Sequence, residues 1–310
     1  MAIVDTTVPI TSASCDRMIR EIVGVYPFCR SEVLTNTVFQ RPVRTLVIGN
    51  GSRKVLYTAA HHANEWITAL VLLRFAEELA EAIASDDAIY GVPARLLAQS
   101  STIYMVPMVD PDGVDLVVGA IPPQSPSFLA AQILASSFPE IPFPAGWKAN
   151  LVGVDLNLNY PAGWLQAREI KFAQGFDRPA PRDFVGRAPL NQLETRALAG
   201  YTQTLDPALV LAYHTQGRVI YWQFRDYFVP GAEELGRRFA AASGYSLEET
   251  PYASSFAGFK DWFIQDYRRP GYTIEVGEGE NPLPLSQFDQ IYRENIGILT
   301  IAAAPDLAES

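Results

Sequence analysis

Apolar residues between Ile67 and Ala84 recur at steps of three and four positions, which is the spacing of an amphipathic helix. The residues that carry this pattern are Leu70, Leu73, Phe75, Leu79 and Ile83. Helix-like patterns also cover Glu233 to Ala242, Asp261 to Tyr267 and Ser286 to Ala303. The chain therefore predicts at least four helices, the last of them at the C-terminus.

Short β-rich runs lie between these helices. Val43 to Ile48 and Lys54 to Ala60 are separated by Asn50-Gly51-Ser52, a turn signal that predicts a hairpin. The second run leads directly to His61 and His62, and the helix from Ile67 follows. A strand, a turn and a helix in this order commonly place a site at the edge of a sheet. Further strands are expected over Thr102 to Met108, Val210 to Tyr213, Val219 to Trp222 and Gly271 to Gly277.

Two irregular segments follow the strand from Thr102. Asp110-Pro111-Asp112-Gly113 predicts a turn. Residues 120–146 are rich in proline and serine and contain a short helical pattern, Phe128 to Leu134. We interpret them as a surface insertion, because long irregular segments near a site are often functional covers.

Composition and charge narrow the class of protein. The chain has 310 residues, 48% of them hydrophobic, which is ample material for one domain over residues 1–310. The net charge of −10 and the absence of a Lys/Arg run argue against nucleic acid and an anionic membrane surface as partners.

The chain carries no recognisable export signal. Met1 to Thr7 lacks a basic region and an apolar core, and the apolar stretch from Ile67 is interrupted by charged residues. We therefore expect a cytoplasmic protein without a membrane span. Cys15 and Cys29 are expected to be free buried thiols in such a compartment.

The chain contains only three histidines, and two of them have the spacing that a zinc site needs. His62 and Glu65 are three positions apart and can face one point, whereas His214 must come from a different strand. Catalytic zinc is usually held by three imidazole or carboxylate ligands. The alternative is a local hydrogen-bonded pair of His62 and Glu65. His61 has a four-residue spacing to Glu65 and stays an ambiguous neighbour.

Glu275 is an acid in the otherwise apolar run Gly271 to Gly277. An unpaired charge is costly in a buried strand, so a functional role is expected. The alternative is an acid buried in an ion pair.

Five motifs occur in the order found in zinc metallocarboxypeptidases of the carboxypeptidase A type. They are His62-Ala63-Asn64-Glu65-Trp66, Asp110-Pro111-Asp112-Gly113, Gly153-Val154-Asp155-Leu156-Asn157, His214 and Glu275. The resemblance extends from about Ser14 to the C-terminus. It implies a single-domain α/β/α sandwich with a mixed, mostly parallel central sheet flanked by helices, and a core over residues 14–304.

The resemblance also implies zinc as the cofactor, with His62, Glu65 and His214 as its ligands. It gives Glu275 the role of general base toward water activated by zinc, and of proton donor to the leaving amine. The family places its zinc ligand three positions before the acid, which leaves His61 a structural role or a supporting role next to a zinc ligand.

Two further roles follow from the same resemblance. Asp155 would hold a zinc-ligand imidazole through its other ring nitrogen. Lys148 takes the place of the arginine that stabilises the oxyanion in the family, and acts as a point charge instead of a fork.

One departure from the family pattern bears on specificity. Asn157 is followed by Leu158, whereas carboxypeptidases have an Asn-Arg pair that binds the terminal carboxylate. Leucine cannot replace the bidentate contact of a guanidinium. Simple removal of C-terminal residues is therefore not expected.

The segments Gly153 to Pro161, Tyr213 to Gly217 and Glu275 to Pro284 resemble one branch of the family, the bacterial γ-D-glutamyl-L-diamino acid endopeptidases. These enzymes cut the bond between γ-D-glutamate and meso-diaminopimelate in peptidoglycan peptides. The implied substrate is thus a murein peptide, bound with the help of Asn157.

Such peptides carry several carboxylates, so cations are expected in the pocket. Lys260 is near the position where the family sets side-chain specificity, and it is our candidate for a carboxylate contact; a solvated surface lysine is the alternative. Tyr252 is close to the mobile tyrosine of the family, although Ala253 is in register with it. One of several basic residues after Asn157 is expected to add a contact: Arg168, Lys171, Arg178, Arg182 or Arg187.

Other functions stay open at this point. They are an ordinary metallocarboxypeptidase, a zinc-dependent deacylase of small molecules, and a catalytically silent binding protein that has kept the fold. Neither peptide length nor oligomeric state follows from the sequence.

Overall fold

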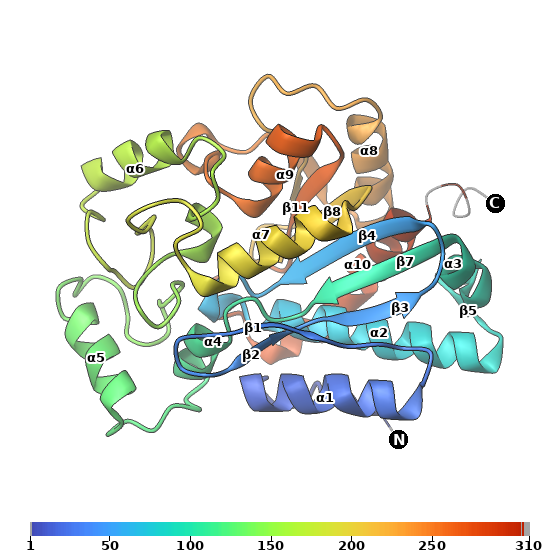
Figure 1. Ribbon diagram of the computed structural model, residues 1–310, viewed down its shortest axis with the longest axis horizontal. Helices are drawn as coiled ribbons and strands as arrows, with labels where there is room; N and C mark the ends of the chain where they lie inside the picture. The colour runs from blue at the N-terminus through green and yellow to red at the C-terminus, as the bar shows by residue number, and fades with distance from the viewer. Residues whose placement is uncertain (1, 305, 307–310) are drawn as a thin grey trace.

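Seven strands form one mixed sheet in the order β10-β9-β11-β8-β4-β7-β3 in a computed structural model that describes residues 2–304 and 306 (Figure 1). The central strands β11, β8, β4 and β7 are parallel, and β3 and β9 run antiparallel to β7 and β11. The expectation of a mixed, mostly parallel sheet is confirmed. The strands are β3 (Leu46–Gly49), β4 (Arg53–Ala59), β7 (Ser101–Val106), β8 (Leu209–His214), β9 (Val219–Tyr221), β10 (Ser246–Glu248) and β11 (Gly271–Glu275).

Helices cover both faces of this sheet. Successive residues of β4 point to opposite faces, so that Tyr57 belongs to one apolar core and Leu56 to the other. The first core is closed by α1 (Ser12–Val25), α2 (Ile67–Ser85), α3 (Ala94–Ser100), α8 (Ala232–Ser243) and α10 (Phe288–Ala303). The second is closed by α6 (Trp164–Ala173), α7 (Leu193–Leu205) and α9 (Phe259–Tyr267). The protein is thus a single α/β domain, as expected.

Shorter elements complete the chain. Two small antiparallel ribbons are formed by β1 (Val33–Asn36) with β2 (Pro42–Arg44) and by β5 (Ala88–Ile89) with β6 (Val92–Pro93). The short helices α4 (Pro111–Val117) and α5 (Pro126–Ala135) lie at one end of the molecule (Figure 1). Single 3-10 turns are η1 (Ala63–Glu65), η2 (Leu156–Leu158), η3 (Tyr252–Ser254) and η4 (Leu285–Gln287).

The predicted hairpin is wrong. β3 and β4 do not pair with each other, because β7 lies between them and pairs with both. The connecting turn contains Gly51, where a Cβ would come within 2.1 Å of the backbone of Ser100. The turn therefore spans the start of a third strand, and its glycine is needed for this close approach.

The predicted turn at Asp110 is wrong as well. Asp110 is the N-cap of α4, and its Oδ1 accepts a hydrogen bond from the backbone N–H of Gly113 at 2.9 Å. Pro111 occupies the first helical position, which suits a residue without an N–H. The same residues that favour a turn thus begin a helix.

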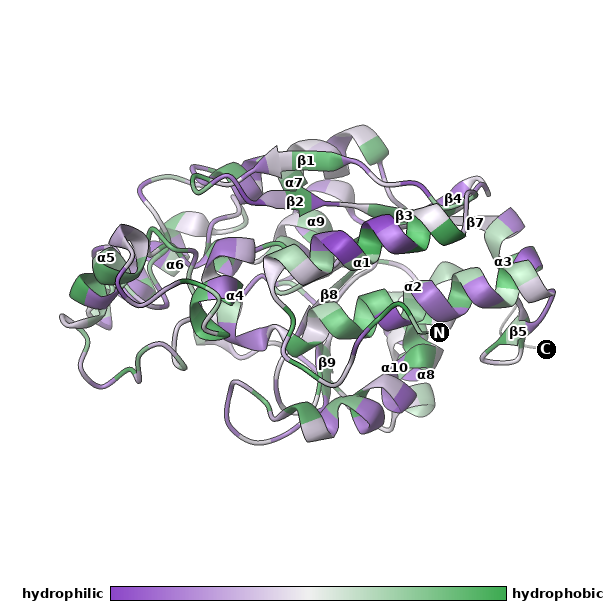
Figure 2. Cartoon of the chain, turned by 90° about the horizontal axis from the view of Figure 1, so that it is seen from below, coloured by the Kyte–Doolittle hydropathy of each residue, from purple (hydrophilic) through white to green (hydrophobic). Residues whose placement is uncertain are grey.

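The run Val43 to Ile48, predicted as one strand, is divided between β2 and β3, which belong to different sheets. The other predicted helices and strands are present, including α5 at the pattern from Phe128. The helices α1, α3, α6 and α7 were not predicted. α1 contains both hydrophilic and hydrophobic residues (Figure 2). It buries Cys15, Met18, Ile19 and Ile22. Cys15 and Cys29 are buried free thiols. Among the residues described, none of the helices has the length and apolar character to cross a membrane.

Candidate active site

Three neighbouring strands bring the candidate site residues to one edge of the sheet. β4 ends at Ala59 and is followed by His62 and Glu65, while His214 is the last residue of β8 and Glu275 the last of β11. These strands are parallel neighbours, so their carboxyl ends meet at the same edge. His214 and Glu275 lie opposite each other in the strand register.

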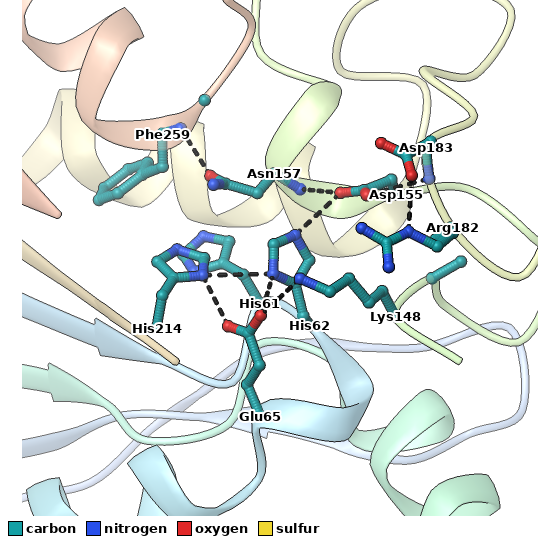
Figure 3. Close-up of polar contacts among 12 residues, drawn as sticks. His61, His62, Glu65, Lys148, Asp155, Asn157, Arg182, Asp183, His214 and Phe259 are labelled. Carbon is teal, nitrogen blue, oxygen red and sulfur yellow. Dashed lines mark hydrogen bonds and ion pairs between the residues drawn. The ribbon is translucent and has the colours of Figure 1, made fainter. Parts of the chain in front are cut away.

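His62, Glu65 and His214 converge on one point (Figure 3). Glu65 lies between the imidazoles, with Oε1 2.9 Å from His62 Nδ1 and Oε2 2.9 Å from His214 Nδ1. The two Nδ1 atoms are 3.3 Å apart.

This donor set fits zinc. Bonds of about 2.0–2.1 Å to a tetrahedral ion place neighbouring ligand atoms about 3.3 Å apart. The three distances between ligand atoms, 2.9, 2.9 and 3.3 Å, are near this value, and imidazole with carboxylate is a common ligand set of catalytic zinc. The local-pair alternative for His62 and Glu65 does not account for His214, which completes the cluster.

Asp155 fixes the orientation of the His62 ring. Its Oδ1 lies 3.1 Å from His62 Nε2, so that Nδ1 of the same ring faces the cluster. The carboxylate is itself held by the backbone N–H groups of Asn157, at 3.1 Å, and Asp183, at 3.2 Å. A carboxylate in this position keeps a ligand imidazole in one tautomer and one orientation.

Lys148 and Glu275 are the charged groups beside the cluster. Lys148 Nζ lies 2.9 Å from Glu65 Oε1, and both residues line the same cavity as Glu275. Burial, with a smaller contribution from the Glu65 carboxylate, raises the pKa of Glu275 to about 8. A carboxyl group with a pKa near neutrality can both accept and donate a proton at physiological pH.

His61 is outside the cluster. Its ring stacks on His214 with centroids 5.7 Å apart, and its Nε2 lies 3.3 Å from the hydroxyl of Tyr160. The side chain is fully buried. The structure therefore places His61 as a packing partner of His214, in agreement with the structural role expected for it.

The cluster opens into a cavity of about 260 Å³ whose wall is rich in charged side chains. Asn157 lines this cavity, and its Oδ1 accepts a hydrogen bond from the backbone N–H of Phe259 at 3.0 Å. Leu158 is also in the wall. The position beside Asn157 thus faces the cavity with a side chain that cannot bind a carboxylate.

Lys260 lies in the cavity wall, but its ammonium group already has partners within the protein. Its Nζ donates to the carbonyl of Gln223 at 2.7 Å and to Thr250 Oγ1 at 3.2 Å, and pairs with Asp261 Oδ1 at 2.7 Å. Only 3% of the residue is exposed. The alternative of a solvated lysine is therefore wrong, and a substrate carboxylate would have to displace one of these partners.

Tyr252 does not reach the cavity. It is 75% exposed and its ring packs on Phe256, whereas its neighbours Thr250, Pro251 and Ser254 form the wall. The geometry lends no support to a substrate contact by Tyr252.

The basic residues after Asn157 divide into two groups. Lys171 and Arg182 line the cavity, whereas Arg168, Arg178 and Arg187 do not. Sequence spacing gave no way to make this distinction among Arg178, Arg182 and Arg187, because the path of residues 174–192 is irregular. Trp164 and Phe224 belong to the core, and Trp222 is half-buried against it.

Comparison with known proteins agrees with this geometry. A profile of the family described as zinc carboxypeptidase matches residues 16–297. The chain is 43% identical over 280 residues to γ-D-glutamyl-L-diamino acid endopeptidase 1 of Lysinibacillus sphaericus, covering 90% of this chain and 68% of the relative.

Solved structures share the fold. Bovine thrombin-activatable fibrinolysis inhibitor in complex with tick carboxypeptidase inhibitor superposes with a TM-score of 0.73 at 15% identity, over 97% of this chain and 98% of the other. Murein-tripeptide amidase MpaA from Escherichia coli O157 gives a TM-score of 0.56 at 20% identity, over 87% and 91% of the two chains. The family match covers the metal cluster and the whole sheet, and the chain therefore belongs to the zinc carboxypeptidase family and is a zinc metallopeptidase.

Proposed function

We propose that this metallopeptidase hydrolyses the amide bond between γ-D-glutamate and meso-diaminopimelate in peptidoglycan-derived peptides. The Lysinibacillus sphaericus relative is named for this type of bond, and the chain matches it over 90% of its own length. The observation that carries the proposal is the cavity wall. Leu158 stands where a carboxypeptidase would bind a terminal carboxylate, while Lys148, Lys171 and Arg182 supply positively charged groups elsewhere around the cluster.

His62, Glu65 and His214 would hold the zinc. When bound, zinc supplies Lewis-acid polarisation of a carbonyl and lowers the pKa of water. Asp155 keeps the His62 ring in its orientation throughout.

Glu275 and Lys148 would act on the substrate itself. Glu275 accepts a proton from the attacking water and delivers it to the nitrogen of the leaving diamino acid. Lys148, whose ammonium group lies at the Glu65 carboxylate, offsets negative charge that develops on the carbonyl oxygen.

Digestion of isomeric tripeptides tests the proposal. The zinc-loaded protein is incubated with L-Ala-γ-D-Glu-meso-diaminopimelate and with its α-linked isomer, and the products are identified by mass spectrometry. We expect release of diaminopimelate from the γ-linked peptide at a much higher kcat/KM. Efficient release of C-terminal leucine or phenylalanine from ordinary α-linked peptides, with no cleavage of the γ-linked one, would instead identify an ordinary carboxypeptidase.

A further inference from the structure

The loop at residues 181–184 is anchored directly to the active-site segments. The carbonyl of Pro181 accepts hydrogen bonds from the backbone N–H groups of Lys148, at 2.8 Å, and Ala149, at 2.9 Å. Two residues later, the backbone N–H of Asp183 donates to Asp155 Oδ2, and the N–H of Asp155 donates to the carbonyl of Phe184 at 2.8 Å. The loop is therefore fixed relative to the residues that surround the metal cluster.

Asp183 holds the side chain of Arg182 in this loop. Its Oδ2 lies 2.6 Å from Arg182 Nε, and its Oδ1 lies 2.5 Å from Lys171 Nζ. Asp183 itself has a positive φ of 66°, a conformation that few residues other than glycine adopt. Strained backbone of this kind persists where the surroundings enforce it, often beside functional sites.

Arg182 is the most exposed of the lysine and arginine side chains that line the cavity, and it has donors left for a ligand. Only its Nε has a partner among the described residues, so both terminal nitrogens of the guanidinium are available. The side chain is 41% exposed, compared with 12% for Lys171 and 4% for Lys260. Asp183 balances one of the two cations that it contacts, which leaves a net positive charge at this part of the wall.

The position of Arg182 selects one part of the substrate. Figure 3 shows Lys148 and Arg182 on one side of His62 and Phe259 on the other. Lys148 is the residue assigned above to the carbonyl oxygen, so Arg182 lies on the acyl side of the bond, away from α9. The acyl group of a γ-linked substrate is D-glutamate, whose free α-carboxylate is separated from the scissile carbonyl only by Cα, Cβ and Cγ.

We propose that Arg182, held by Asp183, binds the free α-carboxylate of the γ-D-glutamyl residue and thereby determines acyl-side specificity. A guanidinium with two free terminal nitrogens can make a bidentate contact with a carboxylate, which the side chain of Leu158 cannot make. The inference rests on the proposed function and names the residue that recognises its substrate.

Two tripeptides that differ in this carboxylate test the inference. One is L-Ala-γ-D-Glu-meso-diaminopimelate, and the other carries the α-carboxamide, D-isoglutamine, in place of D-glutamate. We expect Arg182→Gln to lower kcat/KM by about 10 to 100-fold on the carboxylate peptide, the size of a lost charge-assisted hydrogen bond. The loss on the carboxamide peptide should be much smaller, and Arg182→Lys should recover part of the activity on the carboxylate peptide.

Arg178→Gln is the matched control. Arg178 belongs to the same irregular segment, but it pairs with Asp177, is 57% exposed and does not line the cavity. This variant should keep the wild-type ratio between the two peptides, and all variants should retain the zinc content and the Tm of the wild type.

Three outcomes would overturn the inference. Equal losses on both peptides in Arg182→Gln would mean that Arg182 does not contact the α-carboxylate. Wild-type kcat/KM on both peptides in Arg182→Gln would place the contact on another residue. Cleavage of neither peptide by the wild type would refute the proposed function and this inference together, which separates that failure from the first two.

Discussion

At the scale of single residues, Glu275 is the acid that lines the cavity beside the metal cluster and is our candidate for the general base. It ends β11 beside His214, and burial raises its pKa to about 8. We predict that Glu275→Gln lowers kcat by about 100 to 10,000-fold, because an amide cannot accept the proton of the attacking water. Steady-state kinetics on the γ-linked tripeptide measure the effect.

A loss of kcat can be assigned to the missing general base only if the metal site of the variant is intact. Glu275→Gln should bind zinc as the wild type does, because Glu275 is not part of the three-residue cluster. Retention of more than about a tenth of the wild-type kcat would show that another group accepts the proton, since a lost general base costs far more than this.

Lys260 offers a second test. A structural ion pair with Asp261 and a contact with a substrate carboxylate predict different results for its replacement. Lys260 and Asp261 are each only 3% exposed, so Lys260→Met leaves a buried carboxylate without its cation. We predict a loss of about 3 to 5 kcal/mol in the free energy of unfolding, measured by urea denaturation. The double variant Lys260→Met with Asp261→Asn should recover part of this loss. Wild-type stability with a selective loss of activity on diaminopimelate peptides would instead assign Lys260 to a substrate carboxylate.

At the scale of elements, the predictable parts were those whose pattern is local. α2 and α10 have long apolar stripes, and the strands that carry His214 and Glu275 are short apolar runs flanked by polar residues. α1 shows the same helical spacing at Cys15, Met18, Ile19 and Ile22, but polar residues surround these positions and the pattern was missed. The pairing of β3 and β4 with β7 could not be predicted. A turn signal in the sequence does not indicate whether a third strand lies between the two strands that the turn connects.

α7 carries a buried acid at its second position. Glu194 is 1% exposed, Oε2 has no hydrogen-bond partner within the described structure, and burial raises its pKa to about 7. The folded state therefore binds this proton more tightly than the unfolded state. The contribution of Glu194 to the free energy of unfolding decreases as the pH rises from about 4.5 to about 7, and it is constant above that range.

We predict that Glu194→Gln removes this dependence. The stability of the variant relative to the wild type should increase across this pH window by about 3 kcal/mol, the linkage value of a shift of this size. Urea denaturation at pH 5 and pH 7.5 measures it. A difference that is the same at both pH values would show that Glu194 ionises normally in the folded protein.

At the scale of the whole molecule, the fold brings together residues that are distant in the chain. The spacing of His62 and Glu65 predicted a metal site, and the parallel pairing of β4 with β8 places His214 next to them. Arg182 could not be singled out from its basic neighbours, because its position depends on hydrogen bonds between irregular loops. Tyr252 does not line the cavity, because proximity in the sequence to the family's tyrosine does not fix the direction of a side chain in a loop.

The central claim is that His62, Glu65 and His214 together hold one zinc ion, and the zinc content of the purified protein tests it most directly. Elemental analysis after dialysis against metal-free buffer should find about one zinc per chain in the wild type, because three protein ligands complete the catalytic set. His214→Ala should lose most of this zinc, whereas His61→Phe should keep it, since His61 stacks on His214 without joining the cluster. Substoichiometric zinc in the wild type, or full zinc in His214→Ala, would contradict the account.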